Sequence, residues 1–188
     1  MLGPTDVAPG VARVAARTPT LPPATHTNSY ALGTREVLLV EPATPDDDEL
    51  AEWLAWARGL VSAGRTLVGL LATHHHVDHV GGLDVLAREL GLALFVHADT
   101  AARVAFRGPV RTLDDGDVLT LEGPHRMTLR VLHTPGHAPG HLGLFDEASG
   151  TLVVGDMVAS EGTILIAPAS GGGDMAAYLC QLRRLGAL

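Results

Sequence analysis

The feature that most constrains this chain is the segment Thr73–Gly82, which reads Thr-His-His-His-Val-Asp-His-Val-Gly-Gly. It directly follows Thr66–Ala72, a nearly unbroken apolar run that is typical of a strand buried on both faces. Alternate residues of extended backbone share a face. We therefore expect His74 and His76 to point at one metal ion while His75 points away.

The second half of the segment predicts a neighbouring metal site. A turn after the histidine pair can bring Asp78 and His79 to a second ion, and Gly81 and Gly82 allow the tight bend that starts the next helix. The alternative is a solvent-exposed histidine-rich loop without a function. We favour the metal site because adjacent histidines are costly to desolvate unless something uses them.

Two later blocks place further potential ligands at strand ends. The segment Thr134–His141, Thr-Pro-Gly-His-Ala-Pro-Gly-His, follows a predicted strand and contains His137. The apolar segment Val153–Asp156 ends in Gly-Asp and offers the carboxylate of Asp156. Imidazole and carboxylate ligands suit Zn²⁺ and also accept Fe or Mn. We expect His141 to hydrogen-bond a ligand, and the other histidines (His26, His97, His125 and His133) to be non-ligands.

Hydrophobic patterning predicts a mixed fold that forms one domain over residues 1–188. The predicted strands are Thr27–Leu32, Val37–Val40, Thr66–Ala72, Ala93–Val96, Leu129–His133, Leu142–Phe145 and Leu152–Val154. The predicted helices are one between Asp46 and Gly64, and Gly82–Leu90, Asp99–Ala105 and Asp174–Leu185. This order indicates α/β or α+β layers and not an all-β sandwich.

The amino-acid composition limits the classes of binding partner that we expect. The formal net charge is −8 and every basic residue is arginine, which disfavours a nucleic-acid backbone as partner. No apolar run is long enough to span a membrane, and the N-terminus does not resemble a secretory signal, so we expect a cytoplasmic protein. Cys180 cannot form an internal disulfide and is predicted to be a buried small hydrophobe. The arginine-rich, lysine-free composition suggests a GC-rich bacterial genome.

The three blocks together resemble the metallo-β-lactamase superfamily, whose signature is His-x-His-x-Asp-His, then Gly-His in a Pro-Gly loop, then Gly-Asp. The resemblance runs from about Thr27 to the end of the chain. The Thr-Pro-Gly-His block, and Gly-Asp-Met followed by a helix with Tyr178, are most similar to the glyoxalase II-like branch and to a related branch that contains endoribonucleases. The resemblance implies an αββα sandwich with the metals at one edge of its two sheets.

The resemblance also implies a role for each site residue. It assigns His74, His76 and His137 to the first metal and Asp78 and His79 to the second, with Asp156 as the bridging carboxylate. One or two Zn²⁺ ions are expected. Asp78 would also be catalytic, because it could orient the attacking water or accept its proton.

The family has a further histidine ligand beyond the helix that follows Gly-Asp, and this sequence has no match for it. We therefore expect the domain to be incomplete at its C-terminus, with its last strand missing. The chain would then be a fragment, or would cover the open edge by forming a homo-oligomer.

The activity implied by the resemblance is hydrolysis by a metal-bound hydroxide. The favoured substrate is a small thioester or ester, as in the glyoxalase II-like branch. One alternative is a metal-dependent endoribonuclease, which would need a basic track. The other is a metal-binding module with little or no activity because the C-terminal ligand is absent.

Overall fold

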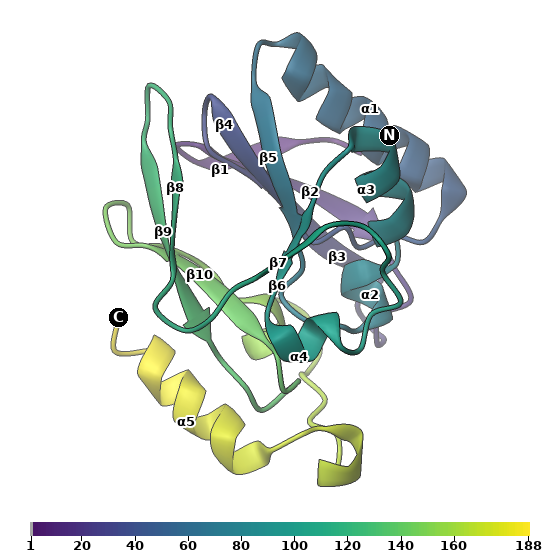
Figure 1. Ribbon diagram of the computed structural model, residues 1–188. Coiled ribbons are helices and arrows are strands. Elements are labelled where there is room, and N and C mark those ends of the chain that lie inside the picture. Colours follow the sequence, from purple (N-terminus) through teal and green to yellow (C-terminus); the bar gives the residue numbers. More distant parts are fainter. Residues whose placement is uncertain (1) are drawn as a thin grey trace.

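The computed structural model describes residues 2–188, which form two β-sheets packed face to face (Figure 1). In this part of the chain the larger sheet has seven strands, whose spatial order follows the sequence. They are β1 (Thr5–Ala8), β2 (Val11–Arg17), β3 (His26–Leu32), β4 (Glu36–Val40), β5 (Thr66–Leu71), β6 (Leu94–Val96) and β7 (Val110–Thr112).

The smaller sheet is antiparallel throughout, in the order β11-β10-β9-β8. Its strands are β8 (Val118–Leu121), β9 (Met127–His133), β10 (Leu142–Asp146) and β11 (Thr151–Val153). The helices are α1 (Asp47–Ser62), α2 (Val77–Val80), α3 (Leu83–Leu90), α4 (Ala98–Ala101) and α5 (Met175–Leu185), with short 3-10 turns η1 (Gly155–Met157) and η2 (Ala169–Gly171). Among the described helices, none is both long and apolar enough to cross a membrane.

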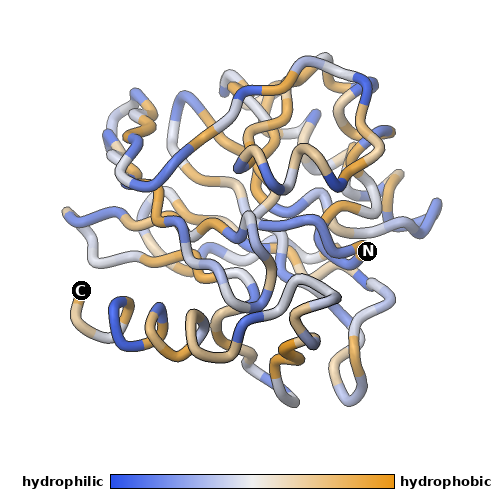
Figure 2. Tube along the Cα trace, turned by 60° about the horizontal axis from the view of Figure 1, so that its bottom comes forward, coloured by the Kyte–Doolittle hydropathy of each residue, from blue (hydrophilic) through white to orange (hydrophobic). Residues whose placement is uncertain are grey.

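Two hydrophobic cores hold the layers together. The first lies between the sheets and contains residues such as Leu38 and Leu71 of the larger sheet and Met127 of the smaller one. The second lies between the larger sheet and α1 and α3, with Trp53 fully buried in it. Figure 2 shows hydrophobic stretches recurring along the chain, and Figure 1 shows α5 on the outer side of the smaller sheet. The αββα architecture is therefore confirmed.

Strand direction brings the functional loops together. β3 and β4 form the expected antiparallel hairpin, whereas β4 runs parallel to β5, so the segments that follow β4 and β5 leave the sheet at the same edge. The N–H of Leu142, at the start of β10, donates to the carbonyl of Thr73, just after β5, at 2.8 Å. This hydrogen bond joins the smaller sheet to the histidine-rich segment.

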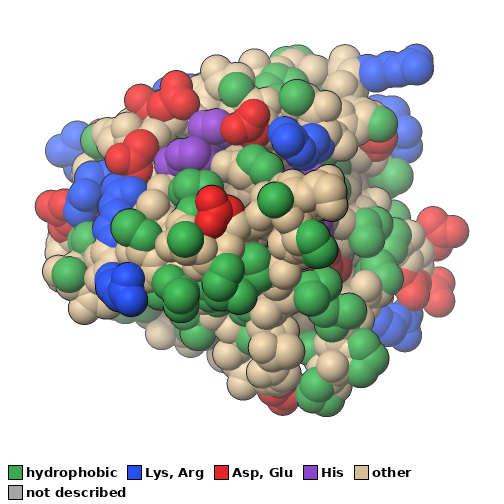
Figure 3. All heavy atoms as spheres, turned by 90° about the horizontal axis from the view of Figure 1, so that it is seen from below, with side chains coloured by type: hydrophobic (Ala, Val, Ile, Leu, Met, Phe, Trp, Pro, Cys, Tyr) green, Lys and Arg blue, Asp and Glu red, His purple; other side chains and the backbone are tan. Residues whose placement is uncertain are grey.

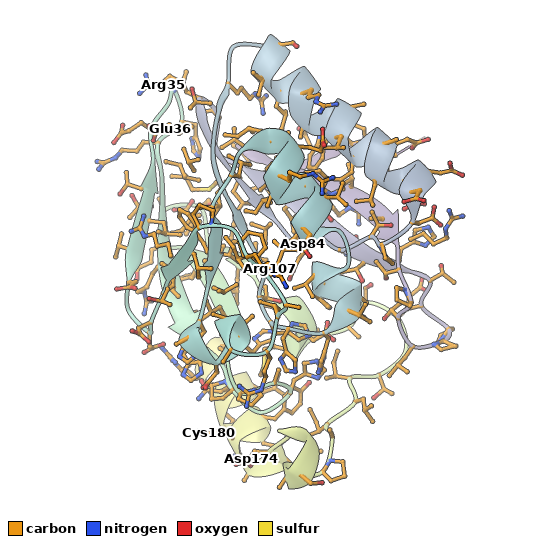
Figure 4. The ribbon with its side chains drawn as sticks, turned by 45° about the vertical axis from the view of Figure 1, so that its right-hand side comes forward. Arg35, Glu36, Asp84, Arg107, Asp174 and Cys180 are labelled. Atoms are coloured by element: carbon orange, nitrogen blue, oxygen red, sulfur yellow. The ribbon has the colours of Figure 1, made fainter. Side chains whose placement is uncertain are left out.

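Several sequence predictions need correction. We did not predict β1, β2, β7 or β8, and the helix expected over Asp99–Ala105 is the single turn α4. The helix at the end of the chain is present, capped by Asp174, whose side chain accepts from the N–H of Ala177. The prediction for Cys180 is wrong. The thiol is exposed, and α5, described along its whole length, has no buried residue. Figure 4 shows Cys180 and Asp174 at the end of the molecule away from α1.

A polar contact fixes the far end of α5 to the smaller sheet. The guanidinium of Arg184 donates to both carboxylate oxygens of Asp115, at 2.8 and 3.1 Å, and to the carbonyl of His133 at 3.1 Å. Partial burial raises the pKa of Asp115, but the hydrogen bond from Arg184 and the N–H of His133 more than offset this and lower it. At the other end of the helix, the backbone passes so close to Gly136 that a Cβ there would lie 2.3 Å from a backbone nitrogen of α5.

Candidate metal centre

The six side chains predicted as metal ligands come from segments that follow strands at one edge of the two sheets. His74 follows β5, His76 caps α2, Asp78 and His79 lie within α2, His137 lies between β9 and β10, and Asp156 lies in η1 after β11. Five of the six form two overlapping triads whose ligand atoms lie within 4.8 Å of one another. Segments far apart in the sequence thus meet at one point.

The first triad consists of His74, His76 and His137. His76 Nδ1 lies 3.0 Å from His74 Nε2 and 2.8 Å from His137 Nε2, and the two Nε2 atoms are 3.2 Å apart. Nitrogens that each bind one tetrahedral Zn²⁺ at about 2.0–2.1 Å would lie roughly 3.3 Å apart. The triangle therefore has nearly the size that a tetrahedral cation requires.

Hydrogen bonding assigns the tautomers of two of these rings. The Nδ1–H of His137 donates to the carbonyl of Leu165 at 2.8 Å, so its Nε2 carries a lone pair. The hydroxyl of Thr73 donates to Glu41 at 2.6 Å and therefore accepts from Nδ1–H of His74, which leaves a lone pair on Nε2 of His74. Two lone pairs that face each other repel unless a cation or proton lies between them. The donor set therefore fits a divalent metal.

The charge state of the first triad also suits metal binding, because imidazole must be neutral to coordinate. Burial, and then the neighbouring His79, lower the pKa of His74 well below its usual value. Burial, and then His137, lower the pKa of His76 to about 4. Both rings are therefore neutral at physiological pH.

The second triad consists of His74, His79 and Asp156. His79 lies between two carboxylates, with Nδ1 3.1 Å from Glu41 Oε1 and Nε2 3.1 Å from Asp156 Oδ1. Burial lowers the pKa of His79, but Glu41 and then Asp156 more than offset it and hold that pKa well above its usual value. Burial likewise raises the pKa of Asp156, yet His79 and then His137 lower it to about 2. Without a metal the ring of His79 is therefore protonated and the carboxylate of Asp156 is ionised, so a cation that binds Nε2 of His79 would have to displace its proton.

Glu41 is a functional residue that we missed in the sequence. It follows β4, is 1% exposed, and has a left-handed φ of 60°. Its carboxylate accepts from the hydroxyl and N–H of Thr73 and lies beside His79. Glu41 therefore orients His79 directly. It also orients His74 indirectly, because the Thr73 hydroxyl that donates to Glu41 accepts from Nδ1–H of His74. A charged residue immediately after the apolar run Val37–Val40 was the available signal.

Two further histidines behave as expected. His141 is fully buried and its Nε2 accepts from the N–H of Asp156 at 3.0 Å, so it positions the backbone of that residue. Burial, and then His137, lower the pKa of His141 to about 3. His75 belongs to neither triad among the described residues and lines a different, smaller pocket.

Asp78 stands apart from the other five. Its carboxylate is 3.9 Å from Nε2 of His79, and it belongs to neither described triad. It nevertheless lines the same cleft as His76, His137 and Asp156. Its role as ligand and catalytic residue therefore stays a prediction.

The candidate metal centre opens into a cleft of about 610 Å³. This volume lies within the roughly 300–1,000 Å³ that is usual for small-molecule sites. One side comes from the segment before β3 and from β3 itself, and the other from the loop after η1. The ligand nitrogens of His76 and His137 thus lie next to a space that a small substrate could occupy.

Comparison with known proteins agrees with this geometry. The family model described as the metallo-beta-lactamase superfamily matches residues 22–188. The chain therefore belongs to the metallo-β-lactamase superfamily. A metallo-beta-lactamase from Pontibacter korlensis has a similar fold, with a TM-score of 0.78 at 17% identity over 98% of this chain and 85% of that one.

Two curated relatives carry names that describe a reaction. An atrochrysone carboxyl ACP thioesterase of Aspergillus novofumigatus is 30% identical over 86% of this chain and 47% of its own length. A hydroxyacylglutathione hydrolase of Cupriavidus taiwanensis is 36% identical over 56% of this chain and 41% of its own length. The chain thus spans about half the length of these relatives.

Proposed function

We propose that this chain is a metal-dependent hydrolase that acts on a small thioester or ester. The observation that carries the proposal is the first triad, in which three imidazole nitrogens, two from the segment after β5 and one from the loop between β9 and β10, lie 2.8–3.2 Å apart beside an open cleft. Such a cluster is costly to desolvate without a ligand, and its lone pairs suit a cation. The names of the two relatives, a thioesterase and a hydroxyacylglutathione hydrolase, support thioester hydrolysis.

Within this proposal each side chain has a task. His74, His76 and His137 would hold the first metal, and His79 and Asp156, with Asp78, would hold a second. A divalent cation there supplies Lewis acidity and a water of lowered pKa. Asp78, at the cleft surface, would orient that water or accept its proton. Zn²⁺ suits the donor set, and Fe or Mn would also fit it.

The ribonuclease alternative is less well supported. A phosphodiester backbone needs clustered cations for binding. Within the described chain no arginine is among the residues that line the cleft, and the sequence has no lysine. The inactive-module alternative remains an outcome of the test below.

The test combines metal content with turnover. The chain, purified without chelator and loaded with Zn²⁺, Fe²⁺ or Mn²⁺, would be analysed for metal by elemental analysis and assayed against thioester, ester, β-lactam and RNA substrates. We expect bound metal and hydrolysis of thioesters or esters, both strongly reduced in H76A. Metal binding without turnover of any substrate would favour the inactive module, and RNA cleavage alone would refute the proposal.

A further inference from the structure

The walls of the cleft bear on the kind of acyl group that the enzyme accepts. Four of its lining residues are large hydrophobic side chains that are more than half exposed to solvent: Leu21 (54%), Val77 (56%), Val158 (58%) and Leu165 (58%). They come from three separate segments, before β3, in α2 and after η1. Exposed apolar side chains that converge on one hollow are typical of a ligand-binding surface.

Apart from its histidines, the side chains that line the cleft in the described chain and are charged at neutral pH are all acidic. The acidic residues are Glu41, Asp78, Asp156 and Glu161, and no arginine lines the cleft in the described part of the chain. Glu41 and Asp156 are engaged by the histidine cluster. Glu161 is exposed and lies in the loop after η1, close in sequence to Val158 and Leu165. A cation bound by the triads would offset the charge of Asp156, whereas Glu161 belongs to neither described triad.

The other polar side chains of the cleft are uncharged, and they include Thr27, Asn28, Ser160 and Thr163. They can hydrogen-bond a carbonyl or hydroxyl group but cannot neutralise a carboxylate. Figure 3, a view from the α5 side, shows many hydrophobic side chains exposed on that face of the molecule. A carboxylate on the acyl group of a substrate would therefore lose its hydration in the cleft without a cationic side chain to pair with, which is costly.

We infer that the preferred substrate carries an uncharged, hydrophobic acyl group, and that acyl groups with a free carboxylate are rejected. This inference rests on the proposed function, because it assigns a substrate class to the same site. The apolar residues Val158 and Leu165 contact the acyl chain, and Glu161 repels anionic analogues. By the same reasoning, a glutathione thioester, whose thiol part bears two carboxylates, is a poorer substrate than a thioester of a neutral thiol.

The test compares two thioesters of one neutral thiol, N-acetylcysteamine, that differ only at the far end of the chain. Hexanoyl and adipoyl groups have the same number of carbons, but adipoyl ends in a carboxylate. At pH 8, where exposed histidines are neutral, we expect kcat/KM of the metal-loaded protein to be at least tenfold higher for the hexanoyl thioester. Equal values, or a preference for adipoyl, would overturn the inference.

A charge-reversal variant tests the residue assignment. In E161R the ratio of kcat/KM for adipoyl over hexanoyl should rise at least tenfold. The control is E147R, which reverses an exposed charge in the turn between β10 and β11, outside the cleft; it also breaks an ion pair with Arg130, which bears on stability, and should leave the ratio unchanged. An unchanged ratio in E161R, in a protein whose circular dichroism matches the wild type, would overturn the role of Glu161.

A binding experiment separates this inference from the proposed function. The ketone analogues, in which CH₂ replaces the thioester sulfur, cannot be hydrolysed, and their binding to metal-free protein can be measured by calorimetry. If no thioester or ester is hydrolysed, the proposed function fails. Tighter binding of the neutral ketone, by at least tenfold, would still support the inference, and equal or absent binding of both ketones would overturn it.

Discussion

Replacing Glu41 with glutamine tests whether one buried carboxylate organises both triads. The amide keeps the size of the side chain but removes the negative charge that lies 3.1 Å from His79 and accepts from Thr73. Removal of a residue that orients a metal ligand typically costs 10–100-fold in metal affinity. For E41Q we therefore expect the dissociation constant of the metal to rise by that factor, which is about 1.4–2.7 kcal/mol.

The metal-free protein should also lose stability. Glu41 and His79 are almost fully buried, and removal of one partner from a buried ion pair costs roughly 3–5 kcal/mol. Asp156 still pairs with His79 in the variant, so we expect the lower end, about 3 kcal/mol. For a domain of this size that corresponds to a fall in Tm of roughly 6–12 °C.

Two measurements check this prediction. Competition with a chromophoric chelator gives the metal affinity, and thermal denaturation in EDTA gives the Tm of the metal-free protein. D84N serves as control, because Asp84 is exposed on α3 and its loss changes the net charge equally. If E41Q matched D84N in both affinity and Tm, the reasoning about Glu41 would be refuted.

Three further predictions concern the ligands and the docking of α5. Replacing Asp156 with alanine should lower metal content and abolish hydrolysis, whereas replacing His75 should change both far less; equal loss in elemental analysis and turnover would contradict the assigned roles. G136A should lower Tm much more than G91A, because both glycines have positive φ but only at Gly136 would the Cβ meet backbone, at 2.3 Å; similar melting curves would show that the close approach to α5 is unimportant. Folding lowers the pKa of Asp115. The ionised Asp115 carboxylate therefore stabilises the fold fully above its ordinary pKa of about 3.9, and this stabilisation is lost as the pH falls through the lowered pKa. Both partners are partly exposed, so D115N should cost at most about 1 kcal/mol at pH 7, and this cost should shrink as the pH falls through the lowered pKa of Asp115, which hydrogen exchange of α5 would measure; equal exchange of wild type and variant at pH 7 would show that the pair does not hold the helix.

The sequence predicted the elements with strong contrast between apolar and polar positions. The segments that precede His74 and His137, and the hairpin before Glu41, were found because each has a continuous or alternating apolar pattern. β2 was missed because its sequence, Val-Ala-Arg-Val-Ala-Ala-Arg, alternates only weakly. β7 is three exposed residues, so its pairing depends on β6 and not on its own side chains.

The burial of α5 and the residues that hydrogen-bond the predicted ligands could not be predicted from the sequence, because both depend on tertiary structure. The apolar residues of α5 predicted a buried Cys180, yet the helix lies on the surface with its thiol exposed. The convergence of His74, His76 and His137 followed from strand ends, which the sequence marks. The roles of Glu41 and Thr73 did not, because they arise from two parallel strands whose ends meet only in the folded sheet.

His74 belongs to both triads, and the chemistry of imidazole limits what that can mean. Its Nδ1 is engaged by Thr73, and Nε2 has a single lone pair, so this ring can coordinate only one cation at a time. The two triads are therefore alternative donor sets and not two complete sites. A cation held by the three imidazoles leaves only His79 and Asp156 for a second ion, which must recruit another donor. Asp78, 3.9 Å from His79, is the side chain from which a small rotation could supply it. Occupancy of the second position should accordingly depend on the identity of residue 78, while occupancy of the first should not.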